Sequence, residues 1–237
     1  MAQISDWIDN KIKISENKIK ISEYREQIMI CENDMRETPY YWVHQWVNNN
    51  LISYQNSFAD SLSFGQYESK KWLIDKLQMT NLKKYEPLKI DIIGSWFGCP
   101  LLELLSEKFN ISQVDLYDID ENCHRVVAQY INHFDFDFRI VQFNDFFERK
   151  ELRRRHLIIN TSSEHMNDIP IMKRYYKNYP DYPILAIQSN NYVSLDDHIN
   201  CVNSENEVKD KNEITRVYYK GTESLPLYDR YMVIGRW

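Results

Sequence analysis

The stretch "KIDIIGSWFGCPLLELL", residues 89–105, decides the fold class of this chain. It joins an apolar run to a leucine-rich amphipathic segment through a turn bounded by Gly94 and Gly98, two of only five glycines in the sequence. In an open α/β sheet, ligands bind beyond the carboxyl ends of the strands, and glycine lets the backbone approach them closely. Turn geometry alone would also explain two glycines four residues apart. The stretch predicts a strand, a ligand-binding turn and a helix.

Strand-like and helix-like segments alternate from residue 88 onward. We expect strands at 88–93, 113–118, 138–143, 156–160 and 183–190, and helices at 99–109, 121–132, 146–154 and 168–178. Two strand-like runs at 213–221 and 229–237 then follow without a long helix between them. This order predicts an α/β fold with a Rossmann-like, doubly wound sheet that is mostly parallel and ends in an antiparallel hairpin.

The N-terminal part has a different pattern and predicts a helical extension. Residues 1–38 lack glycine and proline and contain a near-repeat, KIKISEN (11–17) and KIKISEY (18–24). Trp7, Ile14, Ile21 and Ile28 fall seven residues apart, which favours a long helix over a strand. Such a helix would cap the domain or form a homo-oligomer.

Two shorter helices are expected before the first strand. One covers 40–54, with Trp42 and Trp46 on one face, and the other opens at Ser69 and runs through Leu77. We therefore divide the chain into an N-terminal helical extension, residues 1–60, and a main domain, residues 61–237.

Composition excludes several classes of protein. Of 237 residues, 43% are apolar and 27% are charged, and the net charge is −6. This acidic balance argues against a general polyanion binder but leaves room for a local basic patch. No apolar run approaches the roughly 20 residues of a membrane span, and the N-terminus lacks the layout of a secretory signal.

The cysteines indicate free thiols in a reducing compartment. The four are scattered and form no Cys-x-x-Cys pair: Cys31, Cys99, Cys123 and Cys201. This spacing suits neither a disulfide framework nor a zinc site. We expect a cytoplasmic protein without a bound metal or a membrane partner.

Acidic residues follow the second and third predicted strands. The second ends in Asp118 and Asp120, about 20 residues past the glycines, where a carboxylate can accept both hydroxyls of a ribose. Asp120 also suits the N-cap of the following helix. Asp145 could accept from an exocyclic amine while Phe146 packs against a base, although Asp145 alone would be explained as another N-cap. Together, three strand ends predict a nucleoside site.

At this point the sequence resembles the class I S-adenosylmethionine-dependent methyltransferases. The matching stretches are "IDIIGSWFG", "VDLYDID", "VQFND" and "HLIINTSSEHM", in the family's order, and the terminal hairpin matches its last two strands. The resemblance covers about residues 66–237. The chain also resembles uncharacterised methyltransferase-like phage proteins through "GQYESKKWL", "NTSSEHM" and "QSNNYVSLDDHINCV", which would place it in a host cytoplasm.

The resemblance implies S-adenosyl-L-methionine as cofactor. The turn would lie near its amino-acid portion, Asp118 on its ribose, and Asp145 with Phe146 at its adenine. Trp96 and Phe97 stand where the family's loop has a further glycine. The implied cofactor-binding residues are Gly94, Ser95, Trp96, Gly98, Asp118, Ile119, Asp145, Phe146, Asn160, Gln66 and Lys70. Lys70 could equally be a solvated helix residue.

Candidates for chemistry follow the fourth strand. Asn160 could bind a substrate amine or the cofactor, and Glu164 and His165 are placed to remove a proton from a nucleophile. Other roles are open: Ser163 as a helix cap, Glu164 in a hydrogen-bond network, and His165 as a structural histidine. The stretch is not the Asn-Pro-Pro-Tyr or Asp-Pro-Pro-Tyr signature of amino-directed nucleic-acid methylation.

Further along, the predicted topology brings Asn190, Asn191 and His198 to the same rim as substrate contacts. The basic stretch from Arg149 to Arg155 favours a solvated helix end over an RNA footprint. The leading hypothesis is a methyltransferase acting on a small molecule, nucleoside or RNA. The alternatives are another transfer or lyase reaction of the same cofactor, and an inactive partner-binding module.

Overall fold

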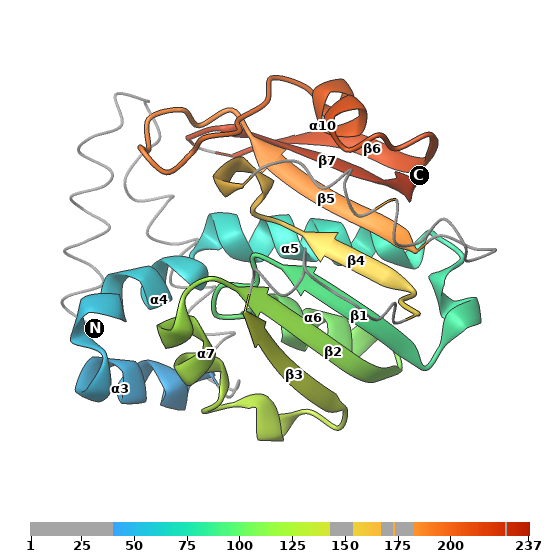
Figure 1. Ribbon diagram of the computed structural model, residues 1–237. Coiled ribbons are helices and arrows are strands. Elements are labelled where there is room, and N and C mark those ends of the chain that lie inside the picture. The colour runs from blue at the N-terminus through green and yellow to red at the C-terminus, as the bar shows by residue number, and fades with distance from the viewer. Residues whose placement is uncertain (1–39, 143–153, 167–172, 174–182, 226) are drawn as a thin grey trace.

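The apolar runs of the sequence form the strands of one twisted sheet (Figure 1). The computed structural model describes residues 40–142, 154–166, 173, 183–225 and 227–237. Within these residues the sheet has the order β3-β2-β1-β4-β5-β7-β6. The strand bounds are β1 Leu88–Ile93, β2 Ile111–Asp118, β3 Asp137–Gln142, β4 Leu157–Asn160, β5 Ile184–Asn190, β6 Arg216–Ser224 and β7 Asp229–Arg236.

The pairing of these strands confirms the predicted fold class. Strands β1 to β5 pair in parallel, whereas β7 runs antiparallel to both β5 and β6. Strands β2 and β3 lie on one side of β1, whereas β4 and β5 lie on its other side. The strand order therefore reverses between β1 and β4. In open α/β sheets the crevice beyond this reversal is where ligands bind.

The described α-helices are α3 Tyr40–Asn50, α4 Gln55–Ser61, α5 Phe64–Gln78, α6 Leu101–Lys108, α7 Glu121–Val127 and α10 Glu205–Lys211. Short 3-10 helices are η1 Ile52–Tyr54, η2 Leu82–Tyr85, η3 Ile131–His133 and η4 Ser163–His165. The predicted helix at 1–38, and all but one residue of each of those at 146–154 and 168–178, lie outside the described residues.

Three helix predictions need correction. The helix expected at 40–54 ends as an α-helix at Asn50. Helix α5 begins at Phe64 rather than Ser69, because Ser63 takes the extended backbone of an N-cap. The predicted helix 121–132 ends as an α-helix at Val127. Helix α10 was not predicted. It begins after Ser204, whose hydroxyl accepts from the backbone N–H of Glu207 at 3.2 Å.

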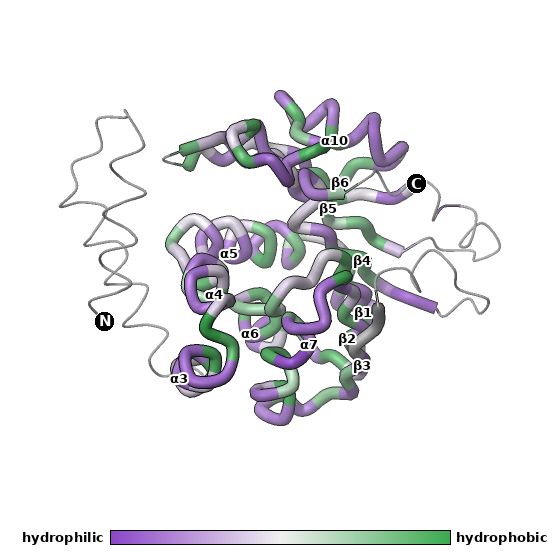
Figure 2. Tube along the Cα trace, turned by 60° about the vertical axis from the view of Figure 1, so that its left-hand side comes forward, coloured by the Kyte–Doolittle hydropathy of each residue, from purple (hydrophilic) through white to green (hydrophobic). Residues whose placement is uncertain are grey.

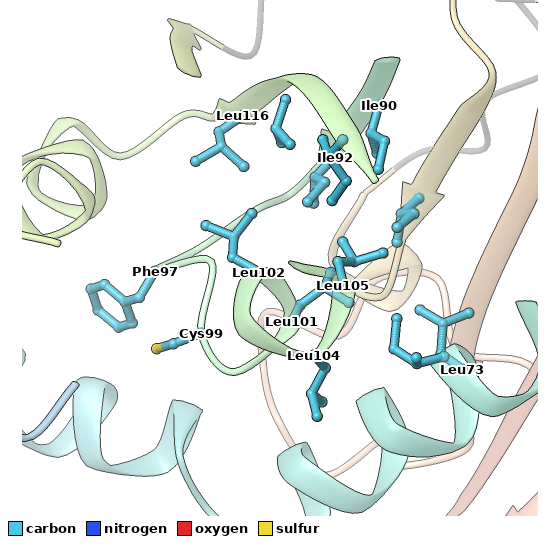
Figure 3. Close-up of a cluster of buried hydrophobic side chains, with 14 of the residues drawn as sticks. Leu73, Ile90, Ile92, Phe97, Cys99, Leu101, Leu102, Leu104, Leu105 and Leu116 are labelled. Atoms are coloured by element: carbon cyan, nitrogen blue, oxygen red, sulfur yellow. The ribbon is translucent and has the colours of Figure 1, made fainter. Parts of the chain in front are cut away.

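Alternation along the strands divides the core into two faces. Ile90 and Ile92 of β1 pack with helices α5, α6 and α7, whereas Ile93 belongs to the cluster on the opposite face. Figure 3 shows the first cluster around Leu102, with Phe97 at one side. On the opposite face, Val208 of α10 packs into the second cluster. Figure 2 shows that most of α10 is otherwise hydrophilic.

Helices α3 and α4 join the same core as the sheet. Val43 and Val47 are buried in the first cluster together with Phe58, whereas Trp42 is 71% exposed. The valines therefore mark the buried face of α3, with Trp46 packed at its edge, so the predicted face with both tryptophans holds only for Trp46. The boundary at residue 60 stays a prediction. None of the described helices is both long enough and apolar enough to span a membrane.

A buried charge network fixes three strands and the start of β4. Arg155 donates to Asp91 of β1 at 2.5 Å and also to Asp115 of β2, and all three side chains are nearly inaccessible. Arg139 of β3 reaches Asp115 at 3.1 Å. The interpretation of Arg155 as part of a solvated basic face was wrong, because its charge is compensated inside the fold. Residues 149–153 lie outside the described residues.

Candidate functional site

The glycine turn, residues 94–98, leaves β1 at the edge of the sheet where strand order reverses. Gly94 and Gly98 have φ of 61° and 72°, and Trp96 between them has φ of 49°. These angles lie in the left-handed region, where a side chain other than glycine is strained. The Gly98 N–H donates to the Ser95 carbonyl at 2.7 Å, and the Leu102 N–H then donates to the Gly98 carbonyl at 3.0 Å. The turn thus leads directly into α6.

Steric contacts give a second reason for both glycines. A Cβ at Gly94 would lie 2.5 Å from Cε of Met166, and a Cβ at Gly98 would lie 2.7 Å from the hydroxyl of Tyr130. The same Gly98 Cβ would lie 2.9 Å from Leu102. Gly94 therefore permits contact with the segment after β4, and Gly98 permits contact with the core.

Asp118 explains how Trp96 can stand where a further glycine would be expected. Its Oδ2 accepts from the backbone N–H of Trp96 at 2.6 Å, and its Oδ1 accepts from the N–H of Asp120 at 3.0 Å. Hydrogen bonds to a carboxylate are among the stronger ones in proteins, so this pair stabilises the strained residue. The ends of β1 and β2 are therefore joined at the predicted ribose position.

Asp120 has the N-cap role that its position predicted. Its Oδ1 accepts from the N–H of Asn122 at 2.9 Å at the start of α7. Ile119, between the two aspartates, is 72% exposed although it is aliphatic. The strand end thus presents a carboxylate and an uncovered apolar side chain side by side.

Aromatic side chains cover the inner side of the glycine turn. The ring of Phe97 is fully buried and makes edge-to-face contacts with Phe58 of α4 at 5.4 Å and with Tyr54 of η1 at 6.5 Å. The Tyr54 hydroxyl also accepts from Asn122 at 3.0 Å. Helix α4 therefore positions the turn, a role that sequence reasoning missed because the contact partners are about forty residues apart.

The segment after β4 lies directly against the turn. Asn160 is buried, accepts from the Ser162 N–H at 2.9 Å, and donates to the sulfur of Met166 at 3.2 Å. The hydroxyl of Ser162 donates to the carbonyl of Gly94 at 3.4 Å. The ends of β1, β2 and β4 thus meet, as the sequence predicted. Asn160 is paired with Ile93 at the end of β1.

Four buried polar side chains, the polar cluster, lie beyond β4, β5 and β7: Lys70, Glu164, Asn190 and Arg230. Glu164 Oε1 accepts from Asn190 at 2.6 Å and lies 3.6 Å from Arg230. Arg230 also donates to the carbonyl of Thr161 at 3.0 Å. Sequence reasoning missed Arg230, whose signal is a charge within the otherwise apolar run of the last strand.

Lys70 of the polar cluster titrates differently in the fold than in solvent. Its ammonium group donates to Gln66 one turn earlier on α5. Burial and the nearby charge of Arg230 together lower the pKa of Lys70 to about 7, although Glu164 acts in the opposite direction. The alternative interpretation of Lys70 as a solvated residue is wrong. Gln66 and Lys70 do lie together, as predicted.

The predicted substrate residues separate into two groups. Asn190 contacts Glu164, and His198 lies close to His165, with ring centroids 4.5 Å apart. Asn191 instead bonds to the start of β7, since it accepts from the Asp229 N–H at 2.9 Å and donates to Tyr231 at 3.3 Å. Asp145 and Phe146 lie outside the described residues, so their adenine contact stays a prediction.

Two buried polar atoms in this region stand out. Ser95 Oγ and Glu164 Oε2 are among the buried polar atoms of the described residues that have no hydrogen-bond partner, as is Arg230 Nε. Burial of a polar atom without a partner costs about 1–3 kcal/mol, so such atoms are typical of places where a ligand binds. Ser95 belongs to the glycine turn and Glu164 to the polar cluster.

Comparisons with known proteins identify the fold. No protein-family model and no curated protein matches the chain. Among solved structures, the candidate methyltransferase in complex with the Trm112 activator of Haloferax volcanii is 11% identical, with a TM-score of 0.53 over 71% of this chain and 90% of that one. A candidate sarcosine dimethylglycine methyltransferase from Galdieria sulphuraria is 15% identical, with a TM-score of 0.50 over 67% of this chain and 65% of that one.

TehB from Haemophilus influenzae also matches, at 16% identity and a TM-score of 0.47, over 69% of this chain and 62% of the TehB chain. At these identities the two matches with TM-scores of 0.50 and 0.53 show a shared fold. The chain therefore has the fold of these two candidate methyltransferases, as the strand order indicates. The resemblance to phage proteins stays a prediction.

Proposed function

We propose that this chain is a methyltransferase that uses S-adenosyl-L-methionine. The observation that carries the proposal is the joined end of β1 and β2, where Asp118 holds the strained Trp96 of the glycine turn. The fold shared with the two candidate methyltransferases supports it.

The residues present fit this cofactor. Asp118 has two oxygens with lone pairs beyond those used by the backbone, so it can accept the ribose hydroxyls. Exposed Ile119 offers an apolar surface for the adenine, and the unpartnered Ser95 Oγ can bind the amino-acid portion at the turn. Gln66 and Lys70 would approach the cofactor from α5.

The cofactor supplies an electrophilic methyl group. In the transfer, a bond forms between that carbon and the acceptor's nucleophile, the carbon–sulfur bond breaks to leave S-adenosyl-homocysteine, and the acceptor loses one proton. Glu164 and His165, with Asn160, lie at the strand ends where an acceptor would approach. We infer a small-molecule or nucleoside acceptor, because Arg155 is internally paired and adds no charge for RNA.

Calorimetry with S-adenosyl-homocysteine tests the proposal. Wild type should bind it, and Asp118→Asn should bind it more weakly because an acceptor oxygen is lost. Ile119→Ala should lose roughly tenfold in affinity, which corresponds to about 1.4 kcal/mol of apolar contact. Ile52→Ala is the matched control, since Ile52 is 77% exposed and lies elsewhere.

The proposal fails if wild type shows no binding heat, or if Ile119→Ala and Ile52→Ala bind alike. Ile119→Ala is decisive because Asp118 also stabilises the turn, whereas an exposed isoleucine contributes little to folding. Product mass after incubation with S-adenosyl-L-methionine and candidate acceptors then distinguishes methyl transfer from transfer of the aminocarboxypropyl group.

A further inference from the structure

Three side chains able to bind a metal converge beyond β4. Glu164 and His165 belong to η4, and His198 comes from the loop after β5, residues 191–201. One ligand atom from each lies within 4.8 Å of the other two. A zinc-type ion forms bonds of about 2.1 Å, so its ligands lie within roughly 4 Å of one another and a small side-chain adjustment closes the site.

Both histidines have one ring nitrogen already engaged by an oxygen. His198 Nδ1 lies 2.5 Å from the carbonyl of Tyr192, which can only accept, so Nδ1 is the protonated nitrogen. His165 Nδ1 lies 3.2 Å from the carboxylate of Asp197. With Nδ1 as the donor, Nε2 is the nitrogen of each ring that could bind a metal ion. Metal-binding histidines are typically held in this way, with the other nitrogen donating to a carbonyl or a carboxylate.

Glu164 is arranged in the corresponding way. Its Oε1 is occupied by Asn190 at 2.6 Å and by the charge of Arg230, whereas Oε2 has no partner among the described residues. The residue is only 3% exposed, so water does not readily compensate that oxygen. The three residues thus bring together a buried carboxylate with one unpartnered oxygen and two imidazoles, a donor set that divalent transition metals bind.

The loop that carries His198 is fastened to η4 by its own hydrogen bonds. The N–H of Asn200 donates to the carbonyl of Glu164 at 2.9 Å, and its side chain donates to the carbonyl of Met166 at 3.0 Å. His198 is therefore held beside the other two ligands by backbone and side-chain contacts rather than by chance proximity.

We propose that Glu164, His165 and His198 bind one divalent transition-metal ion. Two imidazoles and one carboxylate suit zinc, manganese, cobalt or iron, whereas calcium and magnesium prefer ligand sets made of oxygen. The cysteine pattern predicted no metal site, because the ligands here are histidines and a glutamate that are distant in sequence. Glu164 and His165 then serve as metal ligands rather than as a general base.

Three protein ligands leave coordination positions open for a substrate. An acceptor hydroxyl bound there would lose its proton more readily, because a bound metal ion lowers the pKa of the oxygen it holds. This consequence for the acceptor rests on the proposed methyltransferase function, whereas metal binding itself does not.

Metal titration without cofactor tests the site. Protein stripped with a chelator is titrated with Co²⁺ near neutral pH, followed by visible absorption, and with Mn²⁺, followed by loss of the free-ion EPR signal. Wild type should bind one equivalent. His198→Ala and His165→Ala should each weaken binding by at least about 100-fold, and Asp197→Asn, which changes only a partner of His165, by about 10–100-fold.

His133→Ala is the matched control, because His133 is an exposed histidine of η3 and should leave the titration unchanged. The proposal is overturned if wild type binds no Co²⁺, or if His165→Ala, His198→Ala and His133→Ala bind it equally well. Both ligand histidines lie on the outer side of the cluster, so these variants avoid the folding cost expected for Glu164→Gln. Calorimetry with S-adenosyl-homocysteine on His198→Ala separates failure of the metal site from failure of the cofactor site.

Discussion

The glycine turn and the polar cluster lie at the same edge of the sheet but are built from different interactions. The turn is shaped by backbone angles and by hydrogen bonds from main-chain N–H groups to Asp118, with aromatic rings beneath it. The polar cluster is shaped by charged side chains that lie inside the protein, Lys70, Glu164 and Arg230. One region therefore depends mainly on steric fit and the other mainly on charge.

This difference determines how each region should respond to change. Steric fit is insensitive to pH, so damage to the turn should destabilise the fold equally across a pH series. Buried charges exchange protons with solvent differently in the folded and unfolded chain, so the polar cluster should make stability depend on pH. Variants in each region can break or sharpen this distinction.

The largest effect is expected from Gly98→Ala. A left-handed backbone costs a non-glycine residue about 1–2 kcal/mol, and the new Cβ would lie within 3 Å of Tyr130 and Leu102, which adds about 1–3 kcal/mol. We expect a loss of about 2–5 kcal/mol in the free energy of unfolding, measured in urea and constant with pH.

Gly65→Ala in the first turn of α5 is its control. A Cβ there would lie 3.7 Å from the nearest atom, the hydroxyl of Tyr228, so there is room for it. Alanine favours the helix, and Gly65→Ala should raise stability by about 0.5 kcal/mol. Equal effects at the two glycines would contradict the steric account of the turn.

The second largest effect is a dependence of the unfolding free energy on pH that comes from Lys70. Its folded pKa, about 7, lies below its ordinary value of 10.5, so between these values the unfolded chain binds more protons. Stability should therefore rise with pH in this window, by up to about 1.4 kcal/mol per pH unit. Lys70→Met should remove that contribution and should be more stable than wild type near pH 7, with the gap narrowing as pH rises.

Lys71→Met provides the matched control, because the neighbouring lysine is exposed. Urea unfolding at several pH values above 7 measures the difference in unfolding free energy between each variant and wild type. The buried thiols contribute with the opposite sign, but equally in all three proteins, so the difference cancels their contribution. If the free energy of unfolding changed with pH in the same way for wild type and Lys70→Met, the charge of Lys70 would be compensated in the folded state and the prediction would be wrong.

Sequence reasoning located the glycine turn well, because its signals are local. Gly94, Gly98 and Asp118 each follow an apolar run, and parallel strands bring their carboxyl ends to one edge. The same logic placed Asn160 at the end of β4 beside the turn, and Glu164 and His165 in the segment that follows. The cap of α10 was missed although its signal is local, because Ser204 is followed three residues later by Glu207.

The buried charges were harder to predict than the turn, because their partners come from distant segments. Lys70 and Arg155 look like solvated residues in sequence, and only the fold shows that Arg155 meets Asp91 and that Lys70 lies near Arg230. The sequence shows which residues carry a charge. Whether that charge is buried depends on neighbours that are distant in the sequence and become known only from the fold. Contacts such as Phe58 with Phe97 escape local patterns for the same reason.

The smallest effect separates two aspartates that lie two residues apart. Asp120 caps α7 through the N–H of Asn122, so Asp120→Ala should cost about 1 kcal/mol of unfolding free energy, as should Ser204→Ala at the cap of α10. Neither change removes the Asp120 N–H that donates to Asp118. Affinity for S-adenosyl-homocysteine, measured by calorimetry, should therefore be unchanged in both variants and reduced in Asp118→Asn. If Asp120→Ala weakened binding as much as Asp118→Asn while Ser204→Ala did not, the ligand contact would belong to the start of α7 and not to the turn that Asp118 holds.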